Sequence, residues 1–263
     1  MADGTLILAA VAGVVGLLLG SFANVLIHRI PRGESIVRPA SRCPACGRPV
    51  RPGENIPVLS WLWLRGRCAG CQAPISGRYP LVELTVGIGF FVVVWAMGAT
   101  WQALAVVALV YFGVVLSAID LEHHRLPDRL TGAFAIVAGL CVLGVGVSAG
   151  SWEAPLRALV GAAALGLLYG VTFVVYPRGM GFGDVKLAPS IGAVLGVLGW
   201  APLVVGAFAA FLWGAIAGVV TMVRSGRRKG VGIPFGPWMF VGALTGVLAG
   251  DAIADWYLGL MGL

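Results

Sequence analysis

The chain has 263 residues, of which 59% are hydrophobic and 11% are charged, and its mean hydropathy is +0.95. Water-soluble domains carry about 25% charged residues, so this composition excludes an ordinary soluble fold and indicates a membrane protein. The formal charge of +7 is interpreted as a topology signal of such a protein, and we expect no nucleic-acid partner.

The first apolar run covers residues 5–27 and is long enough to span a bilayer, which takes about 20 residues. It lacks a basic segment in front, and it leads into Gly20-Ser21-Phe22-Ala23-Asn24 rather than into a small-residue cleavage site. These features distinguish it from a cleaved signal peptide. We therefore expect residues 1–27 to form a retained transmembrane helix.

Residues 28–79 are the only polar segment of any size and contain two Cys-x-x-Cys pairs, Cys43/Cys46 and Cys68/Cys71. A domain this small seldom has an apolar core large enough to keep it folded, so an additional cross-link such as a bound metal is expected. Two Cys-x-x-Cys turns supply the four thiolates of a closed, structural zinc site. Two disulfides are the alternative, although they are rare in the reducing cytoplasm. Cys141 is interpreted as a small buried apolar side chain.

Seven more apolar runs follow in residues 80–263, which we expect to form one transmembrane domain. They cover residues 80–98, 101–119, 130–148, 156–176, 187–200, 202–223 and 236–258. The run at 187–200 is the shortest and is rich in glycine. The sequence therefore predicts an all-α polytopic membrane protein with about eight transmembrane helices and a small zinc-knuckle insertion after the first.

The basic residues indicate how these helices are oriented. With eight helices, 17 of the 18 Lys and Arg residues fall on one side, and Arg157 falls on the other. They lie in residues 28–79, 120–130, 177–186 and 224–230, the last group being Arg224, Arg227, Arg228 and Lys229. By the positive-inside rule this side is cytoplasmic, which places both termini outside.

Two acidic residues lie at the expected cytoplasmic edge. Asp120 closes the helix of residues 101–119, and Asp184 lies in Gly181-Phe182-Gly183-Asp184, just before the helix of residues 187–200. If these helices are neighbours, the two carboxylates can share a proton, activate water and protonate a carbonyl, as in aspartic proteases. The alternatives are ion pairs with Arg125 or Lys186 that only end the helices, or proton carriage in a transporter.

Other polar residues at this edge have simpler interpretations. Asp128 follows Pro127 and is expected to cap the next helix. Glu83 is interpreted as a first-turn partner of a helix dipole or as a polar contact to substrate. His123 and His124 are not expected to bind metal, because four thiolates already complete a zinc shell.

These motifs resemble, in order and over nearly the whole chain, the bacterial type IV prepilin leader peptidase/N-methyltransferases, which are membrane aspartic proteases of the GxGD type. The matching segments are Gly20–Val25 with His28–Pro31, the Cys43/Cys46 pair, Glu54–Leu62, Arg65–Cys71, Arg78–Leu84, Ile119–Asp120 with Leu126–Asp128, Gly179–Lys186 and Ile233–Pro237.

The resemblance implies a function. In that family the aspartates that match Asp120 and Asp184 form the catalytic pair, which removes the short basic leader of prepilins and pseudopilins on the cytoplasmic side of the inner membrane. The new N-terminal residue is then methylated with S-adenosylmethionine. The matching cysteine segment binds zinc in the bifunctional members.

The cofactor site is not evident in the sequence. A segment of about 50 residues is too small for a Rossmann-type S-adenosylmethionine domain, and no Gly-x-Gly-x-x-Gly follows a predicted strand. Asn24, Glu83 and Lys186 are candidates for contacts to this cofactor. The rival functions are a proton-coupled transporter with a regulatory zinc knob and a scaffold of a secretion machine.

Overall fold

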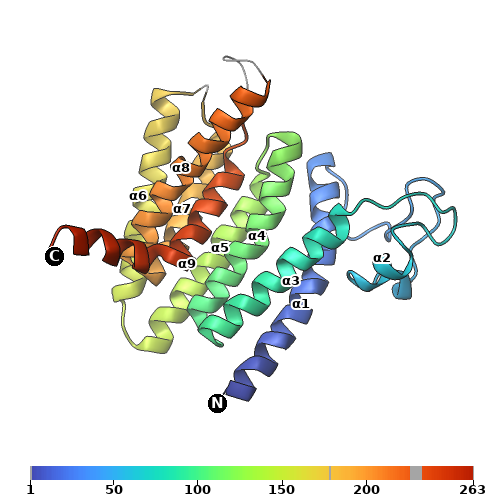
Figure 1. Cartoon of the computed structure of the whole chain (residues 1–263), viewed down its shortest axis with the longest axis horizontal. Helices are drawn as coiled ribbons and strands as arrows, with labels where there is room; N and C mark the ends of the chain where they lie inside the picture. The colour runs from blue at the N-terminus through green and yellow to red at the C-terminus, as the bar shows by residue number, and fades with distance from the viewer. Residues whose placement is uncertain (1, 178, 226–232, 263) are drawn as a thin grey trace. The chain divides into compact units, whose positions relative to one another are not determined.

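The computed structural model describes residues 2–177, 179–225 and 233–262. Arg178, Arg227, Arg228 and Lys229, which contribute to the predicted topology, lie outside the described residues. In the described part the fold is helical, with two isolated β-bridges, Arg42 to Pro49 and Arg67 to Pro74, and no longer strand. The predicted all-α class is confirmed (Figure 1).

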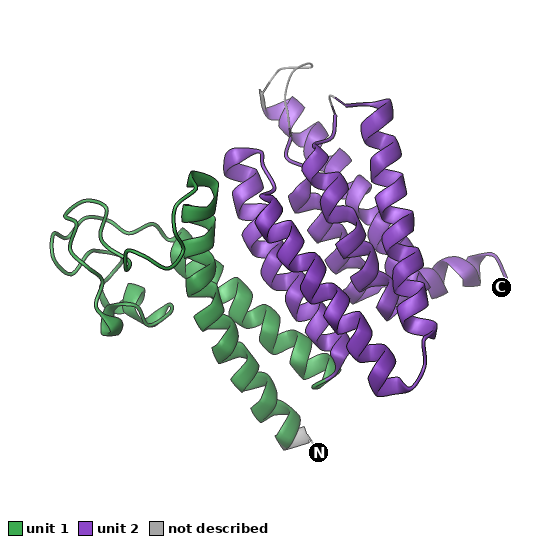
Figure 2. Ribbon diagram, turned by 180° about the vertical axis from the view of Figure 1, so that it is seen from behind, with its two compact units in different colours: residues 1–99 green, residues 100–263 purple. Residues whose placement is uncertain are grey.

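The chain divides into two compact units, residues 1–99 and residues 100–263 (Figure 2). The first unit contains helices α1 (Ala2–Arg29) and α3 (Arg78–Met97). The cysteine-rich segment lies between these two helices in the sequence, and we call it the minidomain. The minidomain contains two 3-10 turns, η1 (Ile30–Arg32) and η2 (Pro52–Glu54), and one short helix, α2 (Leu59–Trp63). Five residues are too few to show helical periodicity, and the sequence analysis did not predict α2.

Helices α1 and α3 pack closely through glycines. A Cβ at Gly16 would lie 2.9 Å from the Cα of Gly87, and a Cβ at Gly20 would lie 2.7 Å from the Cα of Glu83. Small residues allow membrane helices to approach to this distance. Beyond them, the Asn24 amide donates to the Tyr79 carbonyl at 3.1 Å, which fixes the start of α3 beside α1.

The second unit consists of six long helices. They are α4 (Trp101–His123), α5 (Asp128–Ala149), α6 (Glu153–Val175), α7 (Phe182–Leu198), α8 (Trp200–Ser225) and α9 (Gly236–Leu260). Helix α7 contacts the other five and is buried along most of its length. Its carboxyl end is held by Arg157, whose Nε donates to the Gly196 carbonyl at 2.7 Å.

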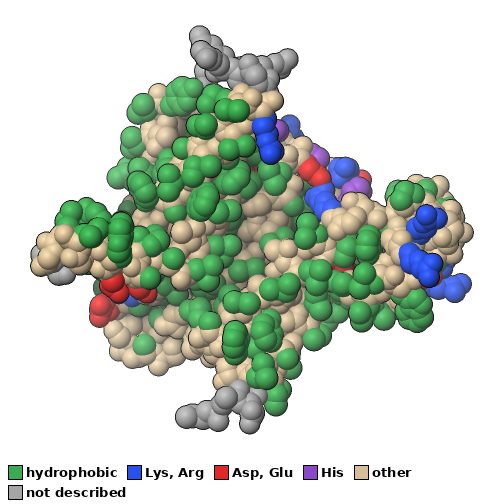
Figure 3. All heavy atoms as spheres, in the orientation of Figure 1, with side chains coloured by type: hydrophobic (Ala, Val, Ile, Leu, Met, Phe, Trp, Pro, Cys, Tyr) green, Lys and Arg blue, Asp and Glu red, His purple; other side chains and the backbone are tan. Residues whose placement is uncertain are grey.

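All eight apolar runs form helices. Seven of the described helices are long and apolar enough to cross a membrane: α1, α3, α4, α5, α6, α8 and α9. The run predicted at 187–200 is α7, which has 17 residues and lies at the lower limit for a spanning helix. Hydrophobic side chains are spread over the visible helix surfaces with few charged side chains among them, as expected for surfaces that face lipid (Figure 3).

Candidate active site and metal centre

Asp120 lies in the last turn of α4, and its residue surface is only 5% exposed. The helix ends three residues later because His124 adopts the left-handed conformation, with its N–H donating to the Asp120 carbonyl at 2.8 Å. The side chain of Asp120 is therefore held at a helix end, with the chain turning away directly after it.

Asp184 lies in the first turn of α7, not before the helix as predicted, and is also 5% exposed. Helix α7 starts five residues before the apolar run, because Gly181 caps it and Asp184 takes the third helical position. The Gly181 N–H donates to Asp184 Oδ2 at 3.0 Å. A carboxylate in this position also interacts favourably with the positive end of the helix dipole.

The structure places the two aspartates in the same part of the second unit. Helices α4 and α7 are in contact, and both also contact α9, whose first residue bonds to Asp120. Leu126, in the turn after α4, lies against both glycine positions beside them: a Cβ at Gly183 would be 2.9 Å from its Cβ, and a Cβ at Gly236 would be 3.3 Å from its Cδ2. The convergence that the sequence made conditional on neighbouring helices is thus possible in this fold.

Gly236 is a site residue to which the sequence analysis gave no role. It opens α9, and its N–H donates to Asp120 Oδ2 at 3.0 Å across 116 positions of sequence. A Cβ at this position would lie 2.8 Å from the same oxygen, which is too close. The Ile233-Pro234-Phe235-Gly236-Pro237 motif was the available signal. Each aspartate therefore accepts one hydrogen bond from a glycine N–H.

Three aromatic rings fix the segment before Gly236. Phe235 packs against Tyr169 and Phe211, with ring centroids 6.0 Å and 5.5 Å away, and the rings of Tyr169 and Phe211 are 5.3 Å apart. These rings come from α6, α8 and the residue that precedes α9. Packing of distant helices therefore places the glycine donor against Asp120.

Two interpretations of acidic residues are wrong. Asp128 does not cap α5: it is the first helical residue, makes no capping hydrogen bond, and forms an ion pair with Lys186 at 2.7 Å. Glu83 is not in the first turn of α3. It is buried, and its Oε2 accepts from the Val58 N–H at 2.7 Å, across the minidomain boundary. Val58 has a φ of 62°, an unusual value for a β-branched residue.

The candidate cofactor contacts belong to different compact units. Asn24 and Glu83 belong to the α1–α3 pair and bond to the Tyr79 carbonyl and the Val58 N–H, respectively. Lys186 belongs to the other unit, bonds to Asp128, and lies 4.9 Å from the centroid of the Phe182 ring. These contacts do not define a common binding site for the three side chains.

The four cysteines of the minidomain come together. Their sulfur atoms all lie within 4.8 Å of one another, and the sulfurs of Cys43 and Cys71 are 3.8 Å apart. In a tetrahedral site with Zn–S bonds of about 2.3 Å, sulfurs are about 3.8 Å apart. The cluster therefore fits one zinc ion, as the spacing predicted.

The two cysteine loops are copies of one local structure. In the first, the Cys43 N–H bonds to the Arg48 carbonyl at 2.9 Å; in the second, the Cys68 N–H bonds to the Ala73 carbonyl at the same distance. The N–H groups of Gly47 and Gln72 return to the first cysteine of each loop, at 2.9 Å and 3.0 Å. Each loop thus aims two sulfurs at one point.

The environment of the cluster shifts the pKa values of two of these thiols in opposite directions. Hydrogen bonds from the Cys71 and Gly70 N–H groups lower the pKa of the Cys68 thiol to about 6. The pKa of Cys71 is raised to about 11: the Ala73 N–H lowers it, but bonds to the neighbouring sulfurs and desolvation outweigh that effect. A metal cation replaces the protons that such a cluster retains.

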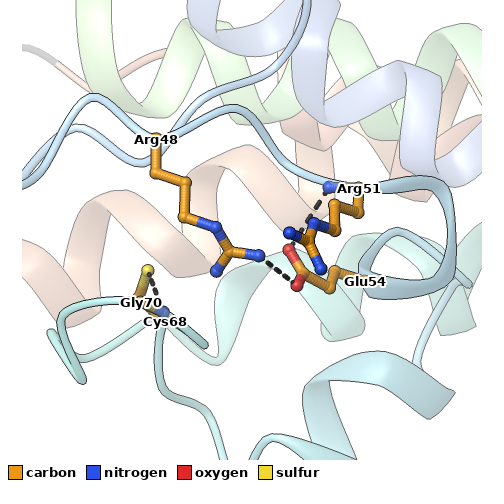
Figure 4. Close-up of polar contacts among 5 residues, drawn as sticks. All are labelled: Arg48, Arg51, Glu54, Cys68 and Gly70. Atoms are coloured by element: carbon orange, nitrogen blue, oxygen red, sulfur yellow. Dashed lines mark hydrogen bonds and ion pairs between the residues drawn. The ribbon is translucent and has the colours of Figure 1, made fainter.

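A basic side chain spans the cysteine loops (Figure 4). Arg48 leaves the first loop, and its Cδ would lie 3.1 Å from a Cβ at Gly70 in the second. Its guanidinium bonds to Glu54, which also accepts from the Arg51 N–H at 3.2 Å. The bond with Arg48 is the main cause that lowers the pKa of the Glu54 carboxyl. Arg48 therefore supplies a positive charge close to the thiolates.

Comparison with known proteins agrees with these features. Residues 14–97 match the bacterial peptidase A24 N-terminal domain, and residues 107–219 match the type IV leader peptidase family. No solved structure matches the chain.

Several relatives carry the name prepilin leader peptidase/N-methyltransferase. The relative from Aeromonas hydrophila is 38% identical over 92% of this chain and 91% of its own length. That from Stutzerimonas stutzeri is 36% identical over 98% of this chain and 96% of its own. The relative from Pseudomonas aeruginosa is 35% identical over 95% of this chain and 93% of its own length. These relatives do not favour the transporter alternative.

The seven membrane-length helices and these relatives identify a multi-pass protein of the bacterial inner membrane. The expected resemblance is confirmed over both halves of the chain. The chain belongs to the type IV leader peptidase family.

Proposed function

We propose that this chain is a membrane aspartic endopeptidase that removes the short basic leader of type IV prepilins and pseudopilins, with Asp120 and Asp184 as its catalytic pair. The names of the relatives supply the substrate class. The observation that carries the residue assignment is the pairing of two buried carboxylates from α4 and α7, each with one glycine N–H donor.

The geometry suits general acid–base hydrolysis. Gly236 and Gly181 each bind one oxygen, Oδ2, of an aspartate, which orients the carboxyl groups and leaves Oδ1 of both for water and substrate. One carboxylate takes a proton from a water molecule while the water oxygen attacks the scissile carbonyl carbon. The protonated partner aspartate donates its proton to the carbonyl oxygen, which gives a diol. Collapse of the diol then breaks the C–N bond: the aspartate that took the proton of water gives it to the leaving nitrogen, and the other aspartate takes the proton of one diol hydroxyl, which restores the pair. Either aspartate can play either part, because the pair titrates as a unit.

We assign this chemistry to the cytoplasmic edge of the inner membrane, with both chain termini outside. The support is the concentration of basic residues in the connections on one side of eight helices. A prepilin carries an apolar helix after its basic leader, so the scissile bond of a membrane-inserted substrate lies at this edge. Both aspartates lie at helix ends, the level that such a bond would occupy.

We assign a structural zinc ion to Cys43, Cys46, Cys68 and Cys71. The mutual sulfur distances and the duplicated loops support this assignment. Four thiolates leave no position for a water molecule or substrate, so the ion would hold the minidomain together rather than take part in catalysis.

We further propose that the chain methylates the new N-terminal residue, as the names of its relatives state for them. S-adenosylmethionine supplies the methyl group when bound. The minidomain contains no sheet of the Rossmann type among its described residues, so this chain would use a different binding mode for the cofactor. The contacts of Asn24, Glu83 and Lys186 assign none of them to it.

One experiment tests both activities. Purified chain in nanodiscs is incubated with a prepilin that carries its leader, with and without S-adenosylmethionine, and mass spectrometry follows the N-terminus. We expect the leader to be lost in both samples and one methyl group to be added only with the cofactor. An intact prepilin would contradict the peptidase proposal, and cleavage without methylation would contradict the second activity alone.

A further inference from the structure

The short helix α2 presents an apolar face that no part of the described chain covers. Leu59, Leu62 and Trp63 are 62%, 59% and 83% exposed. The neighbouring Trp61 turns inward, and its Nε1 donates to the Ile75 carbonyl at 3.1 Å. Grouped large apolar side chains on a polar segment mark an interaction surface.

Helix α2 lies beside the membrane helices of its own unit rather than beyond their ends (Figure 1). The residue before α2, Val58, bonds to Glu83, and Glu83 lies level with Gly20 on α1. Gly20 precedes the end of α1 at Arg29 by nine residues, about 13 Å along a helix that rises 1.5 Å per residue. From the start of α3 at Arg78, the descent to Glu83 is about 7 Å. With the ends of α1 and α3 at the headgroup layer, these distances would bring α2 to the depth where headgroups meet acyl chains.

The backbone of this segment is suited to a medium poor in water. The Val58 N–H bonds to Glu83, and six of the N–H groups that follow it bond to carbonyls within the segment. These donors are the N–H groups of Leu59, Ser60, Leu62, Leu64, Arg65 and Gly66. The Ser60 hydroxyl likewise donates to the Ile56 carbonyl. Internal satisfaction of backbone donors is the condition for placing a segment against lipid.

The charge of the minidomain matches an anionic surface. Residues 28–79, which are the minidomain and the adjoining ends of α1 and α3, contain nine arginines and two glutamates, so this part of the chain carries a formal charge of +7, equal to that of the whole chain. Figure 3 shows basic side chains at the outer edge of the minidomain and hydrophobic side chains at its upper and lower edges. Basic side chains near an anionic bilayer are attracted by its negative surface potential.

We propose that α2 is a membrane-interfacial helix, with Leu59, Leu62 and Trp63 inserted at the boundary between headgroups and acyl chains and the basic minidomain lying on anionic phospholipid. Insertion of one apolar helix face to this depth is typical of monotopic membrane contacts, and tryptophan favours this zone. Attachment to α1 and α3 at both ends keeps α2 at the bilayer, so a short helix is sufficient. This proposal does not depend on peptidase activity.

Fluorescence quenching of the full chain in nanodiscs of phosphatidylcholine and phosphatidylglycerol tests the insertion. The difference between the unmodified chain and Trp63→Phe isolates the emission of Trp63. We expect lipids brominated near the carbonyl end of the acyl chain to quench most of this emission and aqueous iodide to quench little of it. Quenching by iodide alone would overturn the proposal, and quenching by neither would indicate a protein surface, such as a second copy, instead of lipid.

Two variants with the same added charge sharpen the test. Leu62→Glu places a carboxylate on the apolar face of α2, and Ala40→Glu places one at an exposed position far from α2 in the sequence. In Leu62→Glu we expect brominated lipid to quench less of the Trp63 emission and iodide to quench more of it, with the zinc content unchanged. In Ala40→Glu we expect both quenching values to stay as they are in the unmodified chain. An unchanged Trp63 signal in Leu62→Glu would contradict the proposed insertion.

Discussion

The cysteine centre consists of two copies of one short loop, whereas the aspartate pair is assembled from residues of three helices. In the minidomain, the donors that shape each loop come from within six residues of its first cysteine. At the aspartates, the donor to Asp184 is three residues away, but the donor to Asp120 is 116 residues away. Local sequence can build the first site, but the second requires the packing of α4, α7 and α9.

This difference separates two ways of damaging the protein. A change in a cysteine loop should act on metal binding within the minidomain, while a change beside the aspartates should act on hydrolysis and leave the metal bound. Two measurements on each variant, the rate of prepilin cleavage and the amount of zinc per chain, distinguish the two kinds of damage.

Removing the charge of either aspartate should have the largest effect. We expect Asp120→Asn and Asp184→Asn to lower the cleavage rate by about 1,000-fold or more, because an amide is neither a base for water nor an acid for the carbonyl. Bound zinc should not change. Asp128→Asn is the control, since Asp128 is exposed and pairs with Lys186. Full activity in an Asp120 or Asp184 variant, measured by mass spectrometry, would refute the pair.

Loss of one thiolate should remove the metal. We expect Cys43→Ser to bind no zinc and to lose methylation while it retains some cleavage, because the aspartates are held by contacts within the other compact unit. Cys141→Ser is the matched control: Cys141 is buried in α5 and lies outside the cluster. Metal analysis of the purified variants measures the outcome, and one zinc per chain in Cys43→Ser would contradict the assignment.

Gly236→Ala should lower kcat by about 10- to 100-fold with little change in KM, because the methyl group would displace Asp120 rather than block the substrate. Gly181→Ala should lower kcat less than Gly236→Ala does. The new Cβ at position 181 would be 3.3 Å from Asp184 Oδ2, whereas the one at position 236 would be 2.8 Å from Asp120 Oδ2. Gly259→Ala, in the same helix as Gly236 but in open space, controls for the substitution itself. If Gly236→Ala had unaltered kinetics, the glycine donor would have no role in orientation.

The sequence predicted the parts of the molecule that repeat or that contrast sharply with their surroundings. Eight apolar runs gave eight helices, and the Cys-x-x-Cys spacing gave the cluster, because both signals are local. The sequence also singled out Asp120 and Asp184, because the chain has only 11 acidic residues and few of them lie at the expected cytoplasmic edge.

The features that the sequence did not predict depend on tertiary contacts or on first helical turns made of polar residues. Helix α7 begins before its apolar run because Gly181 and Asp184 complete its first turn. Asp128 is bonded to Lys186, 58 positions away, rather than to its own helix. The contact of Gly236 with Asp120 exists only after α4 and α9 have packed.

The smallest predicted effect compares the two cysteine loops at one equivalent position. Gly47 has a φ of 71° and Gln72 a φ of 60°, so the second loop holds a residue with a side chain in the left-handed conformation that the first assigns to glycine. That conformation disfavours side chains by about 1 kcal/mol. Gln72→Gly should therefore slow the removal of zinc by a chelator, and Gly47→Gln should accelerate it, each by roughly fivefold if the full energy difference is realised. Equal rates in both variants would show that the zinc–sulfur bonds, and not loop conformation, limit metal release.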